Sequence, residues 1–367
     1  MKIIFVGSFK QQAKDGSVGG QMFACGSLIE SDISKDVEWI LIDSTADSNK
    51  LAPLFDRLLK AARRLLKFIY CILFKKIDIA LIFTADGYSF VEKGMMVIIA
   101  KAFRKKTILA PRSGIIVDDV KNSAFMRKYI PLVLSNCDFV ICQSEIWRDF
   151  FSKIYNPKAN IYKVIHNWVN TKNYELVSQN KEKNNSIRLL FLSWVDKNKG
   201  IFELIEAALR LKEKNIKIHF DIAGDGLAMD EARQAVSDNG MEDEFTFYSW
   251  VKSDKKLELL RVADIYVLPS HYEGYPNSLM EAMASGKACV ATTVGSIPDI
   301  IVHEKNGLLF EAGNVSDLVA QIEKLMDGNF RKAIGNEAKR ITIARNSIEI
   351  AVASFKEIFQ QVYPQKI

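Results

Sequence analysis

Strand-like and helix-like segments alternate along both halves of this 367-residue chain, and this alternation constrains the fold more than any other feature. Short apolar segments of strand length are separated by longer segments with helical spacing of apolar residues. In the first half, the expected strands are 2–7, 38–43, 78–83, 107–110, 138–142 and 161–165. In the second half, they are 187–192, 217–223, 244–248, 264–269, 288–292 and 307–310. This order predicts an α/β protein with two doubly wound parallel sheets, one in each half.

Length and polarity both indicate two domains. The chain is too long for one ordinary core, because domains mostly hold about 100–200 residues. The segment SQNKEKNNS at 178–186 is polar and poor in apolar residues, which is typical of a linker. We therefore expect a first domain over 1–178 and a second over 187–345.

The charge of the chain is uneven. Residues 1–180 contain 26 Lys and Arg against 17 Asp and Glu (net +9), whereas residues 181–367 contain 24 against 27 (net −3). A basic first half indicates an anionic partner. A membrane surface or a phosphorylated acceptor fits better than nucleic acid, because no basic stripe alternates with aromatic residues as in nucleic-acid readers.

The segment 55–76 concentrates this charge, with seven basic residues, one acidic residue and apolar residues at helical spacing. It can be an ordinary helix that covers the sheet with a basic outer face. It can also be a helix that lies on an anionic membrane surface, and both roles are compatible.

Other features predict a cytoplasmic protein, with peripheral attachment to the inner face of the membrane left open. The chain opens with Met1, Lys2 and the strand-like IIFVG, so no signal peptide is expected. No apolar run reaches the roughly 18 residues that span a bilayer. Five cysteines without a C-x-x-C pair favour reduced, buried thiols over a disulfide or zinc framework.

Residues 271–300, HYEGYPNSLMEAMASGKACVATTVGSIPDI, contain the clearest candidate site. A strand-like segment ends at Pro269, a turn follows, and a helix-forming run begins directly after it. This order presents backbone N–H groups and the positive end of a helix to an anion, most often a phosphate. Glu273 and Glu281 stand eight positions apart and would flank that anion, where carboxylates accept hydrogen bonds from ribose or sugar hydroxyls.

This segment closely resembles the E-x7-E signature of the retaining GT-B glycosyltransferases of the family 4 type, the glycosyl transferases group 1. FLSWVDKNKG at 191–200 resembles that family's phosphate-binding loop, FDIAGDG at 220–226 its second strand and turn, and 263–310 its donor site. The resemblance implies two domains that face a central cleft, with a C-terminal helix at 346–367 that crosses back to the first domain. In the first half it is limited to SVGGQ (17–21), LAPRSG (109–114), FVICQSE (139–145) and VIHNWVN (164–170).

The same resemblance implies roles for individual residues. Lys199 and Glu273 would be catalytic, with Lys199 on the diphosphate and Glu273 on the transferred sugar. Glu281 would accept both ribose hydroxyls. The residues implied for donor binding are Gly19, Gly20, Lys199, Val251, Glu273, Gly274, Tyr275, Asn277, Ser278, Leu279 and Glu281. Arg112, in LAPRSG, is a candidate for acceptor binding, and a salt-bridged structural arginine is the alternative.

For several of these residues, a purely structural role is the alternative. Lys199 can be a solvated lysine, Glu281 a helix-surface carboxylate and Glu273 a loop carboxylate. The pair Trp250-Val251 can lie near the base or form an exposed hairpin tip. Gly19-Gly20 can be a plain flexible loop end.

The chain departs from the family pattern at two places. Ser193-Trp194 stands where the family has Gly-Arg, which removes a phosphate-binding cation that Lys197 or Arg112 could replace. No histidine precedes His166, although many members have a histidine in the first domain that contacts the donor sugar. No D-x-D pair follows an expected strand, so we expect neither a metal nor another cofactor.

These observations predict a retaining, metal-independent glycosyltransferase. The donor would be a nucleotide diphosphate sugar, with UDP favoured. The acceptor would be a lipid-linked or oligosaccharide molecule in cell-surface polysaccharide or lipopolysaccharide synthesis. The alternatives are a catalytically weak sugar-nucleotide-binding partner subunit, or another GT-B activity such as a phosphorylase or an epimerase. The lack of a complete G-x-G-x-x-G weakens a dinucleotide-dependent oxidoreductase.

Overall fold

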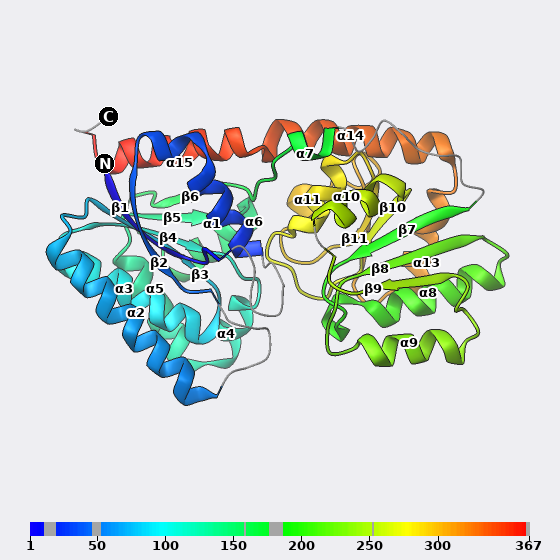
Figure 1. The fold of residues 1–367 in the computed structure, drawn as a ribbon, viewed down its shortest axis with the longest axis horizontal. Coiled ribbons are helices and arrows are strands. Elements are labelled where there is room, and N and C mark those ends of the chain that lie inside the picture. Colours follow the sequence, from blue (N-terminus) through cyan, green and yellow to red (C-terminus); the bar gives the residue numbers. More distant parts are fainter. Residues whose placement is uncertain (11–19, 46–52, 158, 176–185, 252, 365–367) are drawn as a thin grey trace. The chain divides into compact units, whose positions relative to one another are not determined.

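The chain divides into two compact units in the computed structural model (Figure 1). Unit 1 comprises Met1–Asn167 and Ile348–Ile367, and unit 2 comprises Trp168–Ser347. The structure describes residues 1–10, 20–45, 53–157, 159–175, 186–251 and 253–364.

Unit 1 contains a parallel sheet in the order β2-β1-β3-β4-β5-β6. Its strands are β1 (Lys2–Gly7), β2 (Glu38–Asp43), β3 (Ile79–Thr84), β4 (Lys106–Pro111), β5 (Phe139–Cys142) and β6 (Tyr162–Val164). Its helices are α1 (Gly20–Glu30), the 3-10 helix η1 (Asp32–Lys35), α2 (Leu54–Phe74), α3 (Gly87–Ala102), α4 (Ile116–Asn122), α5 (Ala124–Ser135), α6 (Glu145–Ile154) and α15 (Ile348–Val362).

Both faces of the unit 1 sheet are covered, which explains why β3 is buried at every position and apolar up to its last residue, Thr84. Helices α2, α3 and α5 pack on one face around Phe68, Phe90 and Ile130 (Figure 1). Helices α1 and α15 lie on the other face. There the ring of Phe355, in α15, lies 6.4 Å from that of Phe83, in β3.

Unit 2 contains a second parallel sheet, in the order β12-β11-β10-β7-β8-β9. Its strands are β7 (Ile187–Leu192), β8 (Ile218–Ala223), β9 (Phe245–Tyr248), β10 (Ile265–Leu268), β11 (Ala288–Thr292) and β12 (Leu308–Phe310). Its helices are α7 (Lys172–Glu175), the 3-10 helix η3 (Lys197–Lys199), α8 (Ile201–Glu213), α9 (Met229–Asp238), α10 (Ser253–Val262), α11 (Asn277–Ala284), α12 (Ile297–Ile300), α13 (Val315–Lys324) and α14 (Gly328–Asn346).

The central strands of unit 2 position the candidate site. From β7 the chain proceeds to β8 and β9 on one side, whereas β10 leads to β11 and β12 on the other. Helices α8, α9 and α13 pack on one face of the sheet, and α10 and α11 on the opposite face. The loops after β7 and β10 therefore diverge at the carboxyl ends of neighbouring strands, which is where open α/β sheets bind their ligands.

The fold class predicted from the sequence is confirmed, and each expected strand agrees with an observed strand to within one residue at either end. The division of the chain differs from the expected linker at 178–186, because it falls at 167/168 and 347/348. Val169 is already buried in the core of unit 2, where its N–H donates to the carbonyl of Asn346 at 2.9 Å. The polarity of the sequence alone therefore did not locate the boundary between the two units, which depends on contacts between residues distant in the chain.

The structure also describes the state of the cysteines and the polarity of the helices. All five cysteines are free and buried. Within the described ranges, every helix is too short or too polar to cross a bilayer.

Candidate active site

The loops after β7 and β10 bring Lys199 and Glu273 into direct contact. Lys199 is the last residue of η3, and its Nζ donates to Glu273 Oε1 at 2.7 Å and to the carbonyl of Tyr272 at 3.3 Å. The two side chains are only 24% and 10% exposed. Partial burial strengthens such a pair, because less water screens the charges. The two residues predicted to be catalytic therefore meet at the point where the strand order reverses.

Two glycines hold these loops together. Gly200 has φ +73°, and a Cβ there would lie 2.0 Å from the carbonyl oxygen of Pro269. Gly295 has φ +56°, and a Cβ there would lie 1.9 Å from the carbonyl oxygen of Glu273. Left-handed backbone and close approach both require glycine. The loop after β10 is thus clamped between the loops that follow β7 and β11.

Helix α11 begins at Asn277, four positions after Glu273. It has no side-chain cap, and Pro276 precedes its first turn. Helix amino termini carry backbone N–H groups without intrahelical acceptors and a partial positive charge, which together favour an anion. The hydroxyl of Tyr266 donates to Ser278 Oγ at 2.7 Å and fixes this first turn to the buried strand β10.

Glu281 lies in the same helix and is buried, with 6% of its surface exposed. Nζ of Lys256, in α10, donates to Glu281 Oε1 at 2.7 Å. Tyr174, in α7, also hydrogen-bonds to this carboxylate. Burial raises the pKa of the Tyr174 phenol, and the charge of Glu281 raises it further, so the hydroxyl keeps its proton and donates. Glu281 is thus a buried hydrogen-bond acceptor held by two side chains, and it is not a solvated carboxylate on the helix surface.

The sequence interpretation missed Lys256 and Tyr174. Lys256 belongs to the run SDKK and Tyr174 to TKNYE, and neither pattern differs from an ordinary polar surface. Their proximity to Glu281 arises from contacts between distant segments. A sequence signal for either was therefore lacking.

An aromatic pair stands beside these loops. The rings of Trp194, after β7, and Trp250, after β9, lie 5.2 Å apart at 40°, and both side chains are half-buried. Val251 packs partly buried against the core formed by α10 and α11. Trp250-Val251 is therefore not a fully exposed hairpin tip.

Lys197 does not replace the missing cation at position 194 in this structure. Its Nζ lies 3.0 Å from Glu231 Oε1, in α9, and 5.5 Å from the centre of the Phe202 ring. Lys197 lies two residues before Lys199 in η3, so the two side chains point to different sides of this short helix.

Three of the candidates, Gly19, Gly20 and Arg112, belong to unit 1. Gly20 is the exposed first residue of α1, whereas Gly19 lies outside the described residues. Arg112 follows β4, and its Nη2 donates to Asn167 Oδ1 at 2.5 Å while its guanidinium lies 4.8 Å from the centre of the Phe83 ring. Burial lowers the pKa of Arg112 to about 10. Arg112 is thus held by an amide and a ring at the carboxyl end of the sheet.

The remaining donor candidates, Gly274 and Tyr275, lie in the loop that leads into α11. Ser296 Oγ donates to the carbonyl oxygen of Gly274. Tyr275 is buried, and its hydroxyl accepts from Nδ2 of Asn346 at 2.8 Å. Leu279 is fully buried in the core beneath the helix. These contacts make the loop and the first turn of α11 one fixed element.

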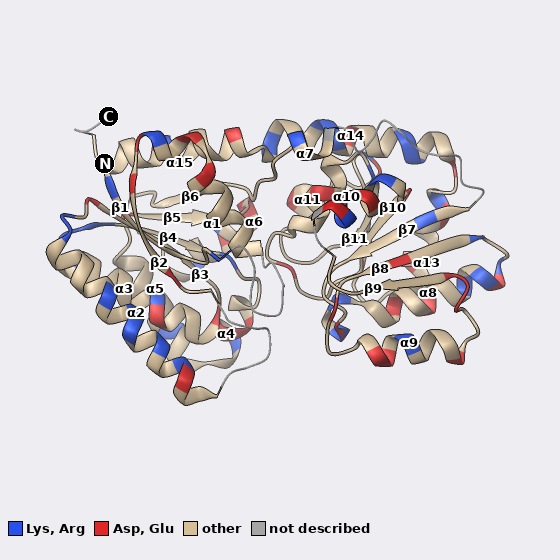
Figure 2. Cartoon of the chain, in the orientation of Figure 1, with Lys and Arg blue, Asp and Glu red and all other residues tan. Residues whose placement is uncertain are grey.

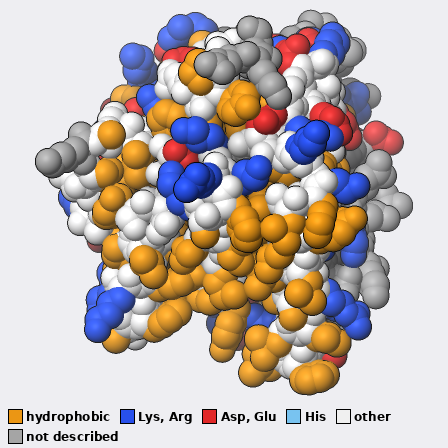
Figure 3. All heavy atoms as spheres, turned by 90° about the vertical axis from the view of Figure 1, so that its left-hand side faces the viewer, with side chains coloured by type: hydrophobic (Ala, Val, Ile, Leu, Met, Phe, Trp, Pro, Cys, Tyr) orange, Lys and Arg blue, Asp and Glu red, His pale blue; other side chains and the backbone are white. Residues whose placement is uncertain are grey.

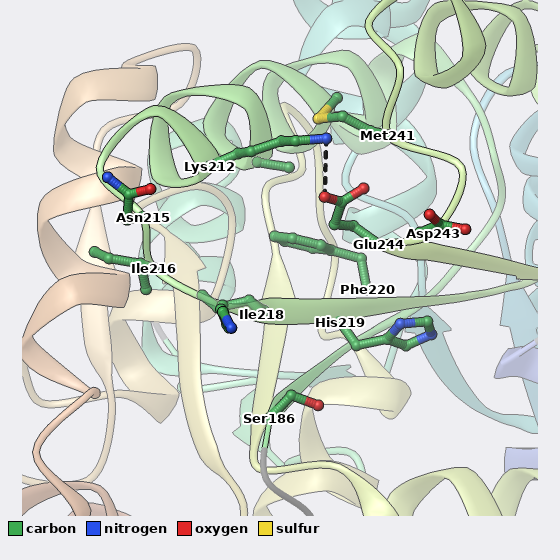
Figure 4. Close-up of a pocket in the computed structure, with 12 residues that line it drawn as sticks. Ser186, Lys212, Asn215, Ile216, Ile218, His219, Phe220, Met241, Asp243 and Glu244 are labelled. Carbon is green, nitrogen blue, oxygen red and sulfur yellow. Dashed lines mark ion pairs between the residues drawn. The ribbon is translucent and has the colours of Figure 1, made fainter.

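A pocket elsewhere in unit 2 does not belong to this site. Its lining includes Ser186 and Ile218, at the amino ends of β7 and β8, and the ion pair between Lys212 and Glu244 at 2.9 Å (Figure 4). Because the strands are parallel, this end of the sheet is opposite to the end that carries Lys199. The described part of the chain holds no group of three or more His, Cys, Asp or Glu placed to bind a metal ion.

Unit 2 is similar in sequence to a known family of proteins. Residues 172–341 match the family described as glycosyl transferases group 1. An uncharacterized glycosyltransferase of Methanocaldococcus jannaschii is 29% identical over 241 residues, which is 62% of this chain and 61% of that protein. The N,N'-diacetylbacillosaminyl-diphospho-undecaprenol alpha-1,3-N-acetylgalactosaminyltransferase of Campylobacter jejuni is 29% identical over 204 residues, 56% of this chain and 50% of that protein. The matches thus span between half and about three fifths of these relatives.

Solved structures share the fold over nearly the whole chain. Sucrose-phosphate synthase from Thermosynechococcus elongatus has a TM-score of 0.80 at 16% identity, with 99% of each chain covered. HepE of Anabaena, in complex with UDP and glucose, has a TM-score of 0.74 at 17% identity, with 98% of this chain and 100% of that chain covered. The chain thus has the GT-B fold, and its residues 172–341 match the model of the glycosyl transferases group 1.

Proposed function

We propose that this protein is a retaining glycosyltransferase that uses a nucleotide diphosphate sugar, preferably a UDP-sugar. The observation that carries the proposal is the contact between Lys199 and Glu273 beside the amino end of α11, at the carboxyl ends of β7 and β10. One cation, a hydroxyl acceptor and a helix amino terminus are the groups that a sugar diphosphate needs. The family match over residues 172–341 and the UDP complex of the structural neighbour support this assignment.

In the proposed reaction, the bond between the anomeric carbon and the β-phosphate oxygen breaks. A new bond forms between that carbon and a hydroxyl oxygen of the acceptor on the same face of the sugar. The hydroxyl proton goes to the departing diphosphate, so the products are the glycoside and the nucleoside diphosphate. Negative charge gathers on the leaving diphosphate, where Lys199 and the N–H groups of α11 stabilise it. No metal is required in this scheme.

The carboxylates would orient the donor. Glu273 accepts hydroxyls of the transferred sugar once Lys199 turns from it toward the diphosphate. Glu281 accepts the ribose hydroxyls, and Lys256 and Tyr174 hold it in place. The pair Trp194 and Trp250 offers an apolar surface for the base.

We propose a lipid-linked or oligosaccharide acceptor and a role in cell-surface polysaccharide or lipopolysaccharide synthesis. The support comes from the names of similar proteins. The Campylobacter jejuni relative is named for a diphospho-undecaprenol acceptor. Another similar structure is that of a lipopolysaccharide outer core galactosyltransferase. Free buried cysteines fit a reducing compartment, the cytoplasm.

One observation favours a second candidate, a catalytically weak partner subunit that binds sugar nucleotides. Trp194, whose ring lies beside that of Trp250, stands at the position where the family has a cation, and Lys197 pairs with Glu231. Such a protein would bind UDP tightly without turnover.

The test measures nucleoside diphosphate release from a panel of UDP- and GDP-sugars, with polyprenyl-diphosphate-linked and oligosaccharide acceptors. We expect acceptor-dependent UDP release that persists in EDTA, and an α-linked product from an α-linked donor by NMR. Tight UDP binding without turnover on every acceptor would support the partner subunit instead. Absence of any nucleotide binding would refute both candidates.

A further inference from the structure

Helix α2 of unit 1 packs against the rest of the unit with only some of its apolar side chains. Phe68, Cys71 and Ile72 are buried in the core under the helix. Arg64 faces α3, where its Nε donates to Glu92 Oε1 at 2.6 Å, and the guanidinium of Arg57 lies 5.0 Å from the centre of the Tyr88 ring. These contacts fix which side of α2 faces the protein.

Another side of α2 is apolar and exposed. Phe55 is 74% exposed and Leu66 67% exposed, although both are large hydrophobic residues. The outer apolar stripe of α2, as we call it, consists of Phe55, Leu58, Leu59, Leu66, Tyr70, Leu73 and Phe74, all of them exposed. Their spacing of three, four and seven residues places most of them on one side of the helix. From Phe55 to Leu73 this stripe runs about 27 Å along the axis, at 1.5 Å per residue.

Cations border this stripe. Lys60, Arg63 and Lys67 are exposed and recur at spacings of three and four residues, so they form a row beside it. Figure 2 shows the blue segments along α2 and the acidic segment at its start, where Asp56 lies. The same arrangement continues at the end of α3, where the exposed Phe103 is followed by the exposed Arg104.

Neighbouring helices extend the apolar surface. Tyr88 and Met95 of α3 and Phe125 and Leu132 of α5 are exposed, and α3 packs between α2 and α5. Figure 3 shows a broad expanse of hydrophobic side chains on the lower half of the unit 1 end, with Lys and Arg at its margins and few acidic side chains. Contiguous apolar surface of this kind marks a contact with another molecule or a membrane.

We propose that the outer apolar stripe of α2 lies on the surface of an anionic lipid bilayer, with Lys60, Arg63 and Lys67 on the phosphate headgroups. A helix with one apolar side and a row of cations is suited to the interface, where the apolar side chains enter about 5–10 Å. The charge complementarity selects anionic lipid over a neutral apolar partner. The inference concerns unit 1 alone and does not depend on the glycosyltransferase activity.

The test is flotation of the full chain with vesicles of phosphatidylcholine containing 30% phosphatidylglycerol, compared with phosphatidylcholine alone. We expect binding to the anionic vesicles only, and its loss in 1 M salt. The variant Lys60→Gln, Arg63→Gln, Lys67→Gln should weaken binding about 100-fold, since each cation near the surface contributes roughly fivefold.

A second variant, Phe55→Gln, Leu66→Gln, Leu73→Gln, removes the stripe, and glutamine preserves helix propensity. It should abolish flotation while its circular dichroism and thermal midpoint stay at the wild-type values. Leu227→Gln is the matched control, because Leu227 is 91% exposed in unit 2 and should not affect flotation. Equal binding to both vesicle types, or a dimer through α2 without any vesicle binding, would overturn the proposal.

Discussion

Unit 1 and unit 2 are built on the same plan of a parallel sheet between helices, but the candidate site of unit 2 and helix α2 of unit 1 depart from the usual distribution of polar and apolar groups in opposite directions. Unit 2 buries charge, since Glu281 and Glu273 are almost enclosed and each is paired with a lysine. Unit 1 exposes apolar surface, since α2 turns large hydrophobic side chains toward solvent. Charged residues are rarely fully buried, and monomers rarely expose large contiguous apolar patches.

Each departure has a cost in an isolated molecule. Burial removes water from a carboxylate, and an exposed apolar side chain gives up the roughly 1.5–3 kcal/mol that full burial would contribute. Both are therefore best explained by a contact with something outside the chain. The polar departure fits a hydroxyl-rich phosphorylated ligand, and the apolar one fits a membrane. Variants that change the buried charge of unit 2 without changing the exposed apolar surface of unit 1 test these two explanations separately.

The largest effect is expected for Lys199→Ala. Loss of the cation should lower kcat on UDP-sugar about 10²–10³-fold, as for removal of one transition-state donor. The measurement is steady-state UDP release, with UDP affinity by calorimetry. Lys214→Ala is the matched control, because Lys214 forms an exposed pair with Glu323 at 2.6 Å. Wild-type kcat in Lys199→Ala would remove this residue from the site.

Glu281→Gln should change the recognition of ribose. A hydrogen bond to a charged acceptor contributes about 1.5–3 kcal/mol, so UDP should bind roughly 10–100-fold more weakly. The preference for UDP over 2′-deoxy-UDP should fall in parallel, because the lost contacts are those to the hydroxyls. Glu323→Gln, which removes the partner of Lys214, controls for the loss of a carboxylate in unit 2. An unchanged ratio of the two affinities would place the ribose elsewhere.

The sequence predicted the strands well because the central ones are buried on both sides. Each observed strand is short and rich in apolar residues, as in β3 (Ile79–Thr84), so periodicity and length located it. The turn and helix after β10 were also predictable, since Pro269, Gly274 and Pro276 punctuate the chain. Local sequence signals of this kind are enough to locate an element whose residues are all buried, or a turn that is marked by proline and glycine.

What the sequence could not predict depends on contacts between distant segments. Lys256 and Tyr174 meet Glu281 only through the packing of α10 and α7 on α11. The direction of Lys197 toward Glu231 depends on the placement of α9. Both roles of 55–76 were compatible with its pattern, and only burial distinguished the packed side chains from the exposed ones.

Gly295→Ala tests how tightly the site of unit 2 is built. Any alanine at positive φ costs about 1–2 kcal/mol, and here the Cβ would also meet the carbonyl oxygen of Glu273. Gly313→Ala is the control, because its φ is +80° but its Cβ would lie an ordinary 3.7 Å from His271 Cε1. We expect Gly295→Ala to reduce the free energy of unfolding by about 1–3 kcal/mol more than the control, measured by urea denaturation. Equal losses of unfolding free energy in the two variants would show that the loop of Glu273 accommodates the added Cβ without further cost.

The buried cysteines allow the two units to be followed separately. Burial raises the pKa of Cys25 and of Cys142, both in unit 1, to about 12, and it also raises the pKa of Cys289, in unit 2. Thiols that are buried and protonated react with a maleimide only after local opening.

If the nucleotide binds to unit 2, UDP at ten times its Kd should slow the labelling of Cys289 about tenfold, since binding stabilises the closed form by mass action. The labelling of Cys25 and Cys142 should change far less, because the unit 1 core opens without disturbing the bound nucleotide. Mass spectrometry of peptides quantifies each site in one experiment. Equal protection of all three thiols would mean that the units open together, and protection of the unit 1 thiols alone would move the nucleotide to the other half of the chain.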